Sequence, residues 1–300
     1  MASGKHAEAE KLWPLIKWSL EYCHRKLNAE GVVTSDSDEL ENRFPSGEAN
    51  LCTSSLYYDA LISAAHLGKA LNKEEKLIKS YRKEAAELYK NIHTYFAREV
   101  EGYDTYRYYD GNTVLRSWIC IPLTMGIYDQ AEGTIAALFS DKLWMENGLL
   151  TQSGTSTYWD RSTLYAFRGS YACGARDIAT KYLEQYSTTR LLGDHVPYAV
   201  EAWPEGNQRH LSTESALYCR IITEGLFGIR PIALNAFTLT PQLPKSWNEM
   251  AIRRICAFGK IYDIEVKRDK GERLLVFIKE DNKTVRKYKV DNGKSVEVRF

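Results

Sequence analysis

The chain has 300 residues, 44% of them hydrophobic, and a formal net charge of +1 at pH 7. This length allows one large domain or one domain with a smaller companion, and the apolar share can supply a substantial core. A near-neutral charge without a basic stripe gives no electrostatic case for nucleic acid or an anionic membrane as partner. No run of 18 apolar residues occurs, so no membrane-spanning helix is expected. The composition does not indicate an oligomeric state.

The first residues lack an apolar signal segment, so we expect a cytoplasmic protein, or a periplasmic or secreted one if the natural N-terminus lies upstream. Six cysteines occur without a CxxC pair or any other short spacing, which predicts buried free thiols and neither a disulfide framework nor a zinc site. The histidines show no paired metal-ligand spacing. No metal or organic cofactor is implied.

Helical periodicity dominates the first three-quarters of the chain. The first predicted helix, 7–28, places Leu12, Leu15, Leu20 and Cys23 on one apolar face. Further helices are predicted at 50–71, 74–97, 113–127, 130–140, 162–191 and 211–227. The helix at 113–127 is apolar nearly all round and should be buried, with a kink at Pro122. Residues 162–191 are expected to form two helices that break near Gly169.

These helices follow a rhythm in which a loop with acidic or aromatic residues precedes an apolar helix, and an amphipathic helix usually comes next. Such a hairpin rhythm predicts an α/α toroid whose inner helices begin at a shared mouth. After residue 230 the pattern becomes an alternation of apolar and polar residues with turns at 269–271 and 291–293. We therefore predict a mostly α protein with an α/α toroid over 1–229 and a small antiparallel β-sandwich domain over 230–300.

Two acidic loops stand out because each lies just before a predicted helix. The upstream loop contains Asp38, Glu39 and Arg43. The downstream loop runs from Glu201 to His210 and also contains Trp203 and Glu205. Two carboxylates on opposing loops above aromatic rings are what acid–base cleavage of a glycosidic bond requires. The alternatives are a solvated acidic loop upstream and a helix-entry charge downstream, which a helix N-terminus favours in any case.

A third loop contains the compact motif Tyr158, Trp159, Asp160 and Arg161. These side chains can bind a sugar by ring stacking, by accepting hydrogen bonds and by donating them. The alternative is an Asp–Arg pair that stiffens the loop, and the sequence leaves both open. Tyr158 and Trp203 are the better stacking candidates because they adjoin a candidate carboxylate or its neighbouring loop.

At these residues the chain resembles the (α/α)₆-barrel, or six-hairpin, glycosidases and phosphorylases, which include trehalase, α-L-rhamnosidase and cellobiose phosphorylase. The spacing of Glu39, Arg43 and Phe44 before a helix is similar to the trehalase-like acidic loop, and Glu201-Ala-Trp203 resembles the later Glu-x-aromatic stretch. The resemblance implies that Glu39, or Asp38, is the general acid and Glu201 the general base of an inverting hydrolysis, with Glu205 a rival base. A complete toroid needs twelve helices, and about eight are predicted here. The chain therefore looks like the C-terminal two-thirds of such an enzyme.

The expected partner is a carbohydrate, bound by Arg43, Tyr158, Trp159, Asp160, Arg161, Trp203 and His210. Two other functions stay open. A glycoside phosphorylase of the same fold would need a phosphate pocket beside Glu201, for which Arg209 and His210 are candidates. A non-catalytic fragment or sugar-binding relative would have carboxylates too far apart for the reaction. The sequence does not specify the sugar, the linkage or the anomer.

Overall fold

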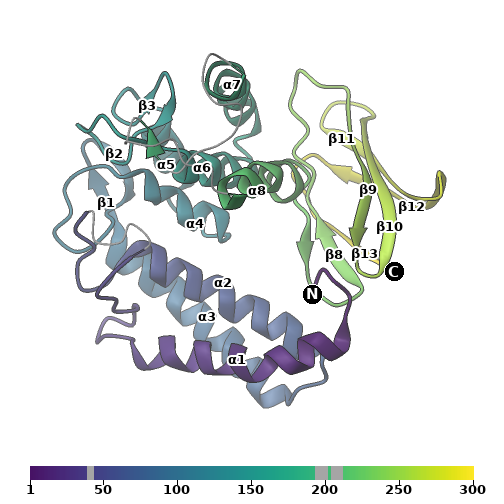
Figure 1. The fold of residues 1–300 in the computed structure, drawn as a ribbon, viewed down its shortest axis with the longest axis horizontal. Coiled ribbons are helices and arrows are strands. Elements are labelled where there is room, and N and C mark those ends of the chain that lie inside the picture. The colour runs from purple at the N-terminus through teal and green to yellow at the C-terminus, as the bar shows by residue number, and fades with distance from the viewer. Residues whose placement is uncertain (39–43, 193–201, 204–211) are drawn as a thin grey trace.

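The computed structural model describes residues 1–38, 44–192, 202–203 and 212–300. Helices make up the first part of the chain and antiparallel strands the last, and the two parts lie side by side in Figure 1. The helices are α1 (His6–Arg25), α2 (Leu51–Ala70), α3 (Glu75–Phe96), η1 (Ser117–Cys120), α4 (Ile121–Thr124), α5 (Ala131–Leu138), α6 (Asp160–Ala172), α7 (Arg176–Tyr186), η2 (Ser187–Leu191), α8 (Ser212–Arg220) and η3 (Ile221–Leu226). The predicted order of a helical part followed by antiparallel strands is confirmed.

One series of helices packs in chain order. α2 contacts η1 and α4, both of these contact α6, and α6 contacts α8 and η3. Most members of the series also contact the helix that follows them: α3 packs on α2, α5 on η1, and α7 on α6. The loop–helix–helix rhythm of the sequence therefore corresponds to a row of packed helices, most of which also pack against the next helix in the chain.

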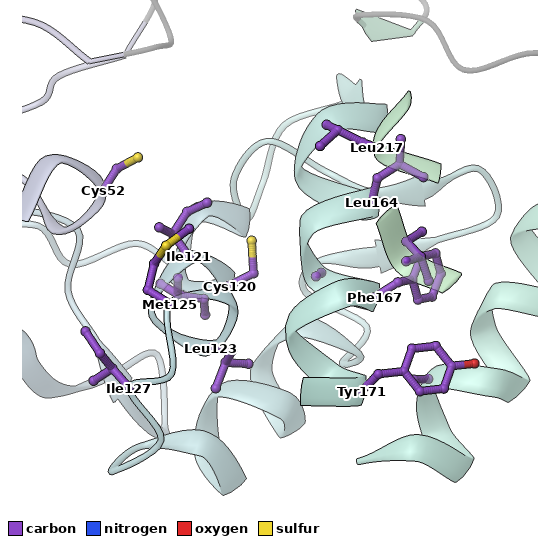
Figure 2. Close-up of a cluster of buried hydrophobic side chains, with 14 of the residues drawn as sticks. Cys52, Cys120, Ile121, Leu123, Met125, Ile127, Leu164, Phe167, Tyr171 and Leu217 are labelled. Atoms are coloured by element: carbon purple, nitrogen blue, oxygen red, sulfur yellow. The ribbon is translucent and has the colours of Figure 1, made fainter. Parts of the chain in front are cut away.

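The interface between α4 and α6 forms the centre of the helical core (Figure 2). Cys120, Ile121 and Leu123 lie in this core together with Leu164 and Phe167 of α6, and all five are buried. The predicted burial of the 113–127 segment is confirmed. Instead of one kinked helix, the segment forms a 3₁₀ turn and a short α-helix that has Pro122 in its first turn, where a missing N–H costs least.

The prediction of two successive helices in 162–191 is confirmed by α6 and α7, but the predicted position of the break near Gly169 is wrong. Gly169 lies inside α6, and a Cβ there would come within 2.8 Å of the Leu123 Cβ. The glycine therefore permits close packing of α6 on α4 and does not end the helix. The chain turns at Gly174, which adopts a φ of 92° that glycine tolerates best.

The predicted apolar face of α1 is also partly wrong. Leu12 and Leu15 are 55% and 58% exposed, whereas Trp13 and Leu20 are buried. The physical reason is the contact with α2, where the Trp13 ring packs against Gly68 so closely that a Cβ on the glycine would lie 3.0 Å from the ring. The large ring therefore faces α2, and Leu12 and Leu15 face outward.

The strands form several antiparallel sheets in the described residues. Short pairs lie among the helices: β1 (Ala97–Val100) with β2 (Tyr103–Tyr106), β3 (Trp144–Met145) with β4 (Gly148–Leu149), and β5 (Tyr158–Trp159) with β6 (Ala202–Trp203). The last part contains β7 (Arg230–Pro231), β8 (Ala236–Leu239), β9 (Glu249–Ala257), β10 (Lys260–Arg268), β11 (Arg273–Glu280), β12 (Lys283–Asp291) and β13 (Val296–Arg299). They form a three-stranded sheet β13-β8-β7 and a four-stranded sheet β12-β11-β10-β9. Phe237 of β8 stacks on Tyr262 of β10, which joins the two sheets.

All six cysteines are free, as predicted. Their burial was predicted wrongly for Cys219 and Cys256, which are exposed. Cys219 lies two residues from the buried Leu217 and so on the other side of α8, and Cys256 occupies an outward position of β9. Among the described helices, none combines the length and apolar character needed to cross a membrane.

Candidate functional site

The loops that precede α2, η1, α6 and α8 are joined to one another, and we call this end of the helical part the rim. Isolated β-bridges pair Asn50 with Tyr109, Arg116 with Gln152, and Leu150 with Tyr158. The pair β5–β6 then places Tyr158 opposite Trp203. The rim therefore collects three loops that the sequence singled out, although they are far apart in the chain.

Asp38 lies on the rim beside a buried arginine. The Tyr108 hydroxyl donates a hydrogen bond to Asp38 Oδ2 at 2.8 Å. The Arg116 guanidinium carbon lies 5.1 Å from the centre of the Tyr108 ring, 5.2 Å from that of Phe44 and 5.5 Å from that of Tyr109. Burial lowers the pKa of Arg116, and the nearby Asp38 charge partly opposes this shift. Aromatic faces thus hold a cation next to the candidate acid loop.

The side chain of Arg116 is buried, and its Nε and Nη1 atoms have no hydrogen-bond partner in the described part of the chain. Sequence reasoning missed this residue. The signal was available, because Arg116 is an isolated charge between Leu115 and the apolar run that begins at Trp118. A single cation in such a run indicates either a buried ion pair or a functional site.

Four charged side chains meet where α6 and α8 begin, and we call Asp160, Arg161, Arg190 and Glu214 the rim cluster. Arg190 Nη2 lies 3.2 Å from Asp160 Oδ2, and these side chains are 0% and 1% exposed. Arg161 Nε donates to Glu214 Oε1 at 2.7 Å, and the Glu214 side chain is 0% exposed. Within the described residues, two carboxylates face two arginines, and paired charges are buried at a lower cost than single ones.

Tyr186 extends the rim cluster into the core. Burial raises its pKa well above the ordinary tyrosine value, and the neighbouring Asp160 carboxylate raises it further. The phenol therefore stays protonated.

The second carboxylate oxygen of Glu214, Oε2, has no hydrogen-bond partner among the residues that the structure describes. Sequence reasoning did not single out Arg190 or Tyr186.

The start of α6 is held by hydrogen bonds from its own first turn. The Thr163 hydroxyl donates to the Trp159 carbonyl at 3.0 Å and accepts from the Leu149 backbone N–H at 3.0 Å. The Ser162 hydroxyl also donates to the Trp159 carbonyl, at 3.1 Å. These contacts fix β5 against β4 and so set the direction in which Asp160 and Arg161 leave the strand.

The structure brings several predicted site residues together. Tyr158 and Trp203 are cross-strand partners through their backbones, and Asp160 and Arg161 follow directly at the start of α6. Trp159 is buried, and its ring lies 6.0 Å from the Arg161 guanidinium carbon. Six other predicted residues lie outside the described residues: Glu39, Arg43, Glu201, Glu205, Arg209 and His210.

No protein-family profile matches this sequence, and a search of curated proteins finds no relative. Solved structures do match. A family GH78 rhamnosidase of Bacillus sp. GL1 superposes with a TM-score of 0.57 at 13% identity, over 92% of this chain and 30% of that one. An α-L-rhamnosidase from Dictyoglumus thermophilum gives 0.56 at 16% identity, over 92% of this chain and 32% of that one. The chain shares the fold of these rhamnosidases.

The neutral trehalase of Saccharomyces cerevisiae also matches, with a TM-score of 0.47 at 17% identity over 58% of this chain and 37% of that one. The two rhamnosidase matches confirm the predicted resemblance to six-hairpin glycosidases at the level of the fold. The chain spans about a third of the length of the rhamnosidases. At these identities the likeness concerns architecture, and the chemistry has to be argued from the rim.

Proposed function

We propose that the chain forms part of a glycoside hydrolase, with residues 1–229 in an α/α toroid and residues 230–300 in a β-sandwich domain. Two findings support this organisation. The helices α2, α4, α6 and α8 pack in chain order, as inner helices of a toroid do. The rhamnosidases that match over 92% of this chain contain both the helical and the strand-rich parts of the fold.

The proposed reaction is hydrolysis with inversion. Glu39 or Asp38 protonates the leaving oxygen, and Glu201, with Glu205 as its rival, deprotonates a water on the opposite face of the sugar. The observation that carries the proposal is the β5–β6 pair. Glu201 directly precedes Ala202, whose backbone pairs with Trp159, so the downstream acidic loop reaches the rim on which Asp38 lies. Inversion requires carboxyl groups roughly 6.5–9.5 Å apart.

In this proposal the substrate stacks on Tyr158 and Trp203, and Arg161 donates to its hydroxyls. Arg43 and His210 complete the binding set from the two acidic loops. Because Trp159 and Asp160 are buried, they do not contact the substrate in this proposal; they hold Arg161 in position. Arg161 is partly exposed while it is bonded to Glu214, so it can reach a ligand and remain oriented.

The test is a turnover assay with a panel of aryl glycosides that includes an α-L-rhamnoside and both glucoside anomers. We expect a released phenol with at least one of them, and NMR of the first-formed sugar should show the inverted anomer. Glu201→Gln should lower kcat by at least roughly 100-fold, the range of a lost general base. Asp38→Asn and Glu39→Gln then identify the acid, because only the acid variant should lose less activity on substrates with a good leaving group.

A matched control is Glu249→Gln, which removes an exposed carboxylate on β9, in the strand-rich part of the chain. It should leave kcat unchanged. Activity that survives in Glu201→Gln and Glu205→Gln alike would contradict the assigned base. Sugar binding without turnover across the panel would contradict the hydrolase and support a binding protein.

A further inference from the structure

A partly open cavity of about 510 Å³ lies between the helical and strand-rich parts, at the end of the helices opposite the rim. Its walls come from the middle of α2, the C-terminal ends of α4 and α6, the turn η3, and the strands β7 and β8. The volume falls within the range of roughly 300–1,000 Å³ that is typical of small-molecule sites. We call it the floor cavity.

Five charged side chains line the floor cavity: Asp59, Arg168, Arg220, Glu224 and Arg230. Arg220 binds Glu224 in a bidentate manner, with Nε at 2.6 Å and Nη2 at 2.9 Å from its two oxygens. Arg168 Nη2 shares the same carboxylate at 2.7 Å, and Arg230 binds Asp59. Three guanidinium groups thus face two carboxylates, which leaves the lining with one excess positive charge.

Glu224 binds both Arg168 and Arg220, and this shared contact locates the excess positive charge. One carboxylate neutralises only one of the two guanidinium groups that it contacts, so the Arg168–Glu224–Arg220 unit carries a net charge of +1. The Arg168 side chain is only 12% exposed, so little water solvates this cation, and burial lowers its pKa. An anion in the cavity would supply the missing counter-charge.

The remaining lining suits an oxyanion. Ser63 and the hydrogen-bonded pair Thr240–Ser295 place hydroxyls in the wall. The Thr124 and Thr238 hydroxyls also line it, but they already donate to backbone carbonyls. A carboxylate or phosphate group takes several donors at once, and arginine matches its planar geometry with two parallel hydrogen bonds. The floor cavity thus combines an uncompensated guanidinium with neutral donors.

The floor cavity is separate from the rim. Arg161 and Arg168 stand seven residues apart on α6, which corresponds to about 10 Å along the helix axis. Tyr165 lies between them, with its ring 6.0 Å from the Arg168 guanidinium carbon and 5.8 Å from the Trp118 ring. A ligand in the cavity therefore meets residues that the proposed hydrolysis does not use.

We propose that the floor cavity binds a small ligand through an oxyanion, either a carboxylate or a phosphate, held by the Arg168–Glu224–Arg220 unit and Arg230. The test is isothermal titration of the whole chain with inorganic phosphate and, in a parallel arm, with acetate, at constant ionic strength set by chloride. Tighter binding of one anion identifies the class of oxyanion. The same titrations with glucose 6-phosphate, which carries a phosphate, and with glucuronate, which carries a carboxylate, then test whether a sugar bearing that group binds.

Two variants of the shared carboxylate unit make opposite predictions. Arg220→Gln removes the excess charge while Glu224 keeps Arg168 as its partner, and it should weaken anion binding about tenfold, the loss expected for one charge-assisted hydrogen bond. Glu224→Gln frees two guanidinium groups and should tighten binding by a similar factor. The control Arg299→Gln removes an exposed arginine that is paired with Glu297 on β13, and it should change nothing.

The proposal is overturned if the wild type binds neither anion. It is also overturned if Arg220→Gln binds anions as tightly as the wild type and the Arg299→Gln control do. Thermal melting without anion shows whether each variant is folded. If Arg220→Gln does not fold, Glu224→Gln still decides the question, since loss of a purely structural ion pair would not increase affinity for phosphate.

Discussion

The two ends of the helical part contain the same residue types in different settings. In the part of the chain that the structure describes, the rim cluster pairs two carboxylates with two arginines, and three of its four side chains are at most 1% exposed. The floor cavity pairs two carboxylates with three arginines, and its side chains are between 12% and 42% exposed. A buried and balanced cluster holds elements in place, whereas a partly open and unbalanced cluster has charge left for a ligand. Burial and charge balance together, more than residue type, separate the two roles.

The largest effect should follow from breaking the pair at the centre of the rim cluster. Asp160→Asn removes the carboxylate charge that lies 3.2 Å from Arg190 Nη2 while keeping the side-chain shape. Removing one charge of a fully buried ion pair is costly, and we expect the free energy of unfolding to fall by about 3–5 kcal/mol. Urea denaturation followed by tryptophan fluorescence measures this change.

The matched control for that substitution is Asp59→Asn in the floor cavity. Its partner Arg230 is 40% exposed, so water solvates the released cation and the expected loss is below about 1 kcal/mol. Equal losses in the two variants would remove the distinction between the rim cluster and the floor cavity.

Glu214→Gln should have an intermediate effect. The substitution keeps an acceptor for Arg161 Nε but replaces a charge-assisted hydrogen bond with a neutral one, and Arg161 is partly exposed. We expect a loss of about 1–3 kcal/mol in the free energy of unfolding. The same urea titration applies. A stability equal to that of the wild type would show that the Glu214 carboxylate is not needed as a charge.

Arg220→Gln should cost the folded state little. Arg220 is 42% exposed and bonds Glu224 within one helical turn, a class of pair worth well under about 1 kcal/mol. Its effect on stability should therefore be small even though its effect on anion binding is large. A loss above about 2 kcal/mol in denaturation would place Arg220 with the rim cluster and not with a ligand site.

The sequence allowed prediction of the elements whose signal is local. Most helices and strands followed from periodicity, and the neighbourhood of Tyr158 and Trp203 followed from the expectation that helix-entry loops share one end. The face of α1 and the break after α6 could not be predicted, because they depend on which glycine another element approaches: Gly68 receives the Trp13 ring, and Gly169 allows α6 to approach α4.

The charge clusters were harder to predict for the same reason. Arg168, Arg220 and Glu224 look like ordinary charges on helix faces, and their meeting depends on how α6 packs against η3. Arg190 pairs with Asp160 across thirty residues. Apart from the i,i+4 pair Arg220–Glu224, these pairings carry no spacing signal in a single sequence, because tertiary packing brings the partners together.

The smallest expected effect is a pH dependence near the floor cavity. Burial lowers the pKa of His66, and the positive charges of Arg230, Arg82 and Lys69 lower it further, while Asp59 opposes them. The unfolded chain therefore takes up this proton near pH 6.5, and the folded chain does so only at lower pH. Below about pH 6.5 the unfolded state binds more protons, so stability falls as the pH falls until the folded pKa is reached.

His66→Gln removes this proton uptake and should flatten the stability profile below about pH 6.5 while leaving it unchanged above that value. Urea denaturation at several pH values between 5 and 8 measures the slope. Phosphate provides the link to the floor cavity, because an anion beside Arg230 offsets part of the positive field on His66 and should reduce the slope of the wild type. A slope that persists in His66→Gln would assign the dependence to another group, and a slope that phosphate leaves unchanged would separate His66 from the anion site.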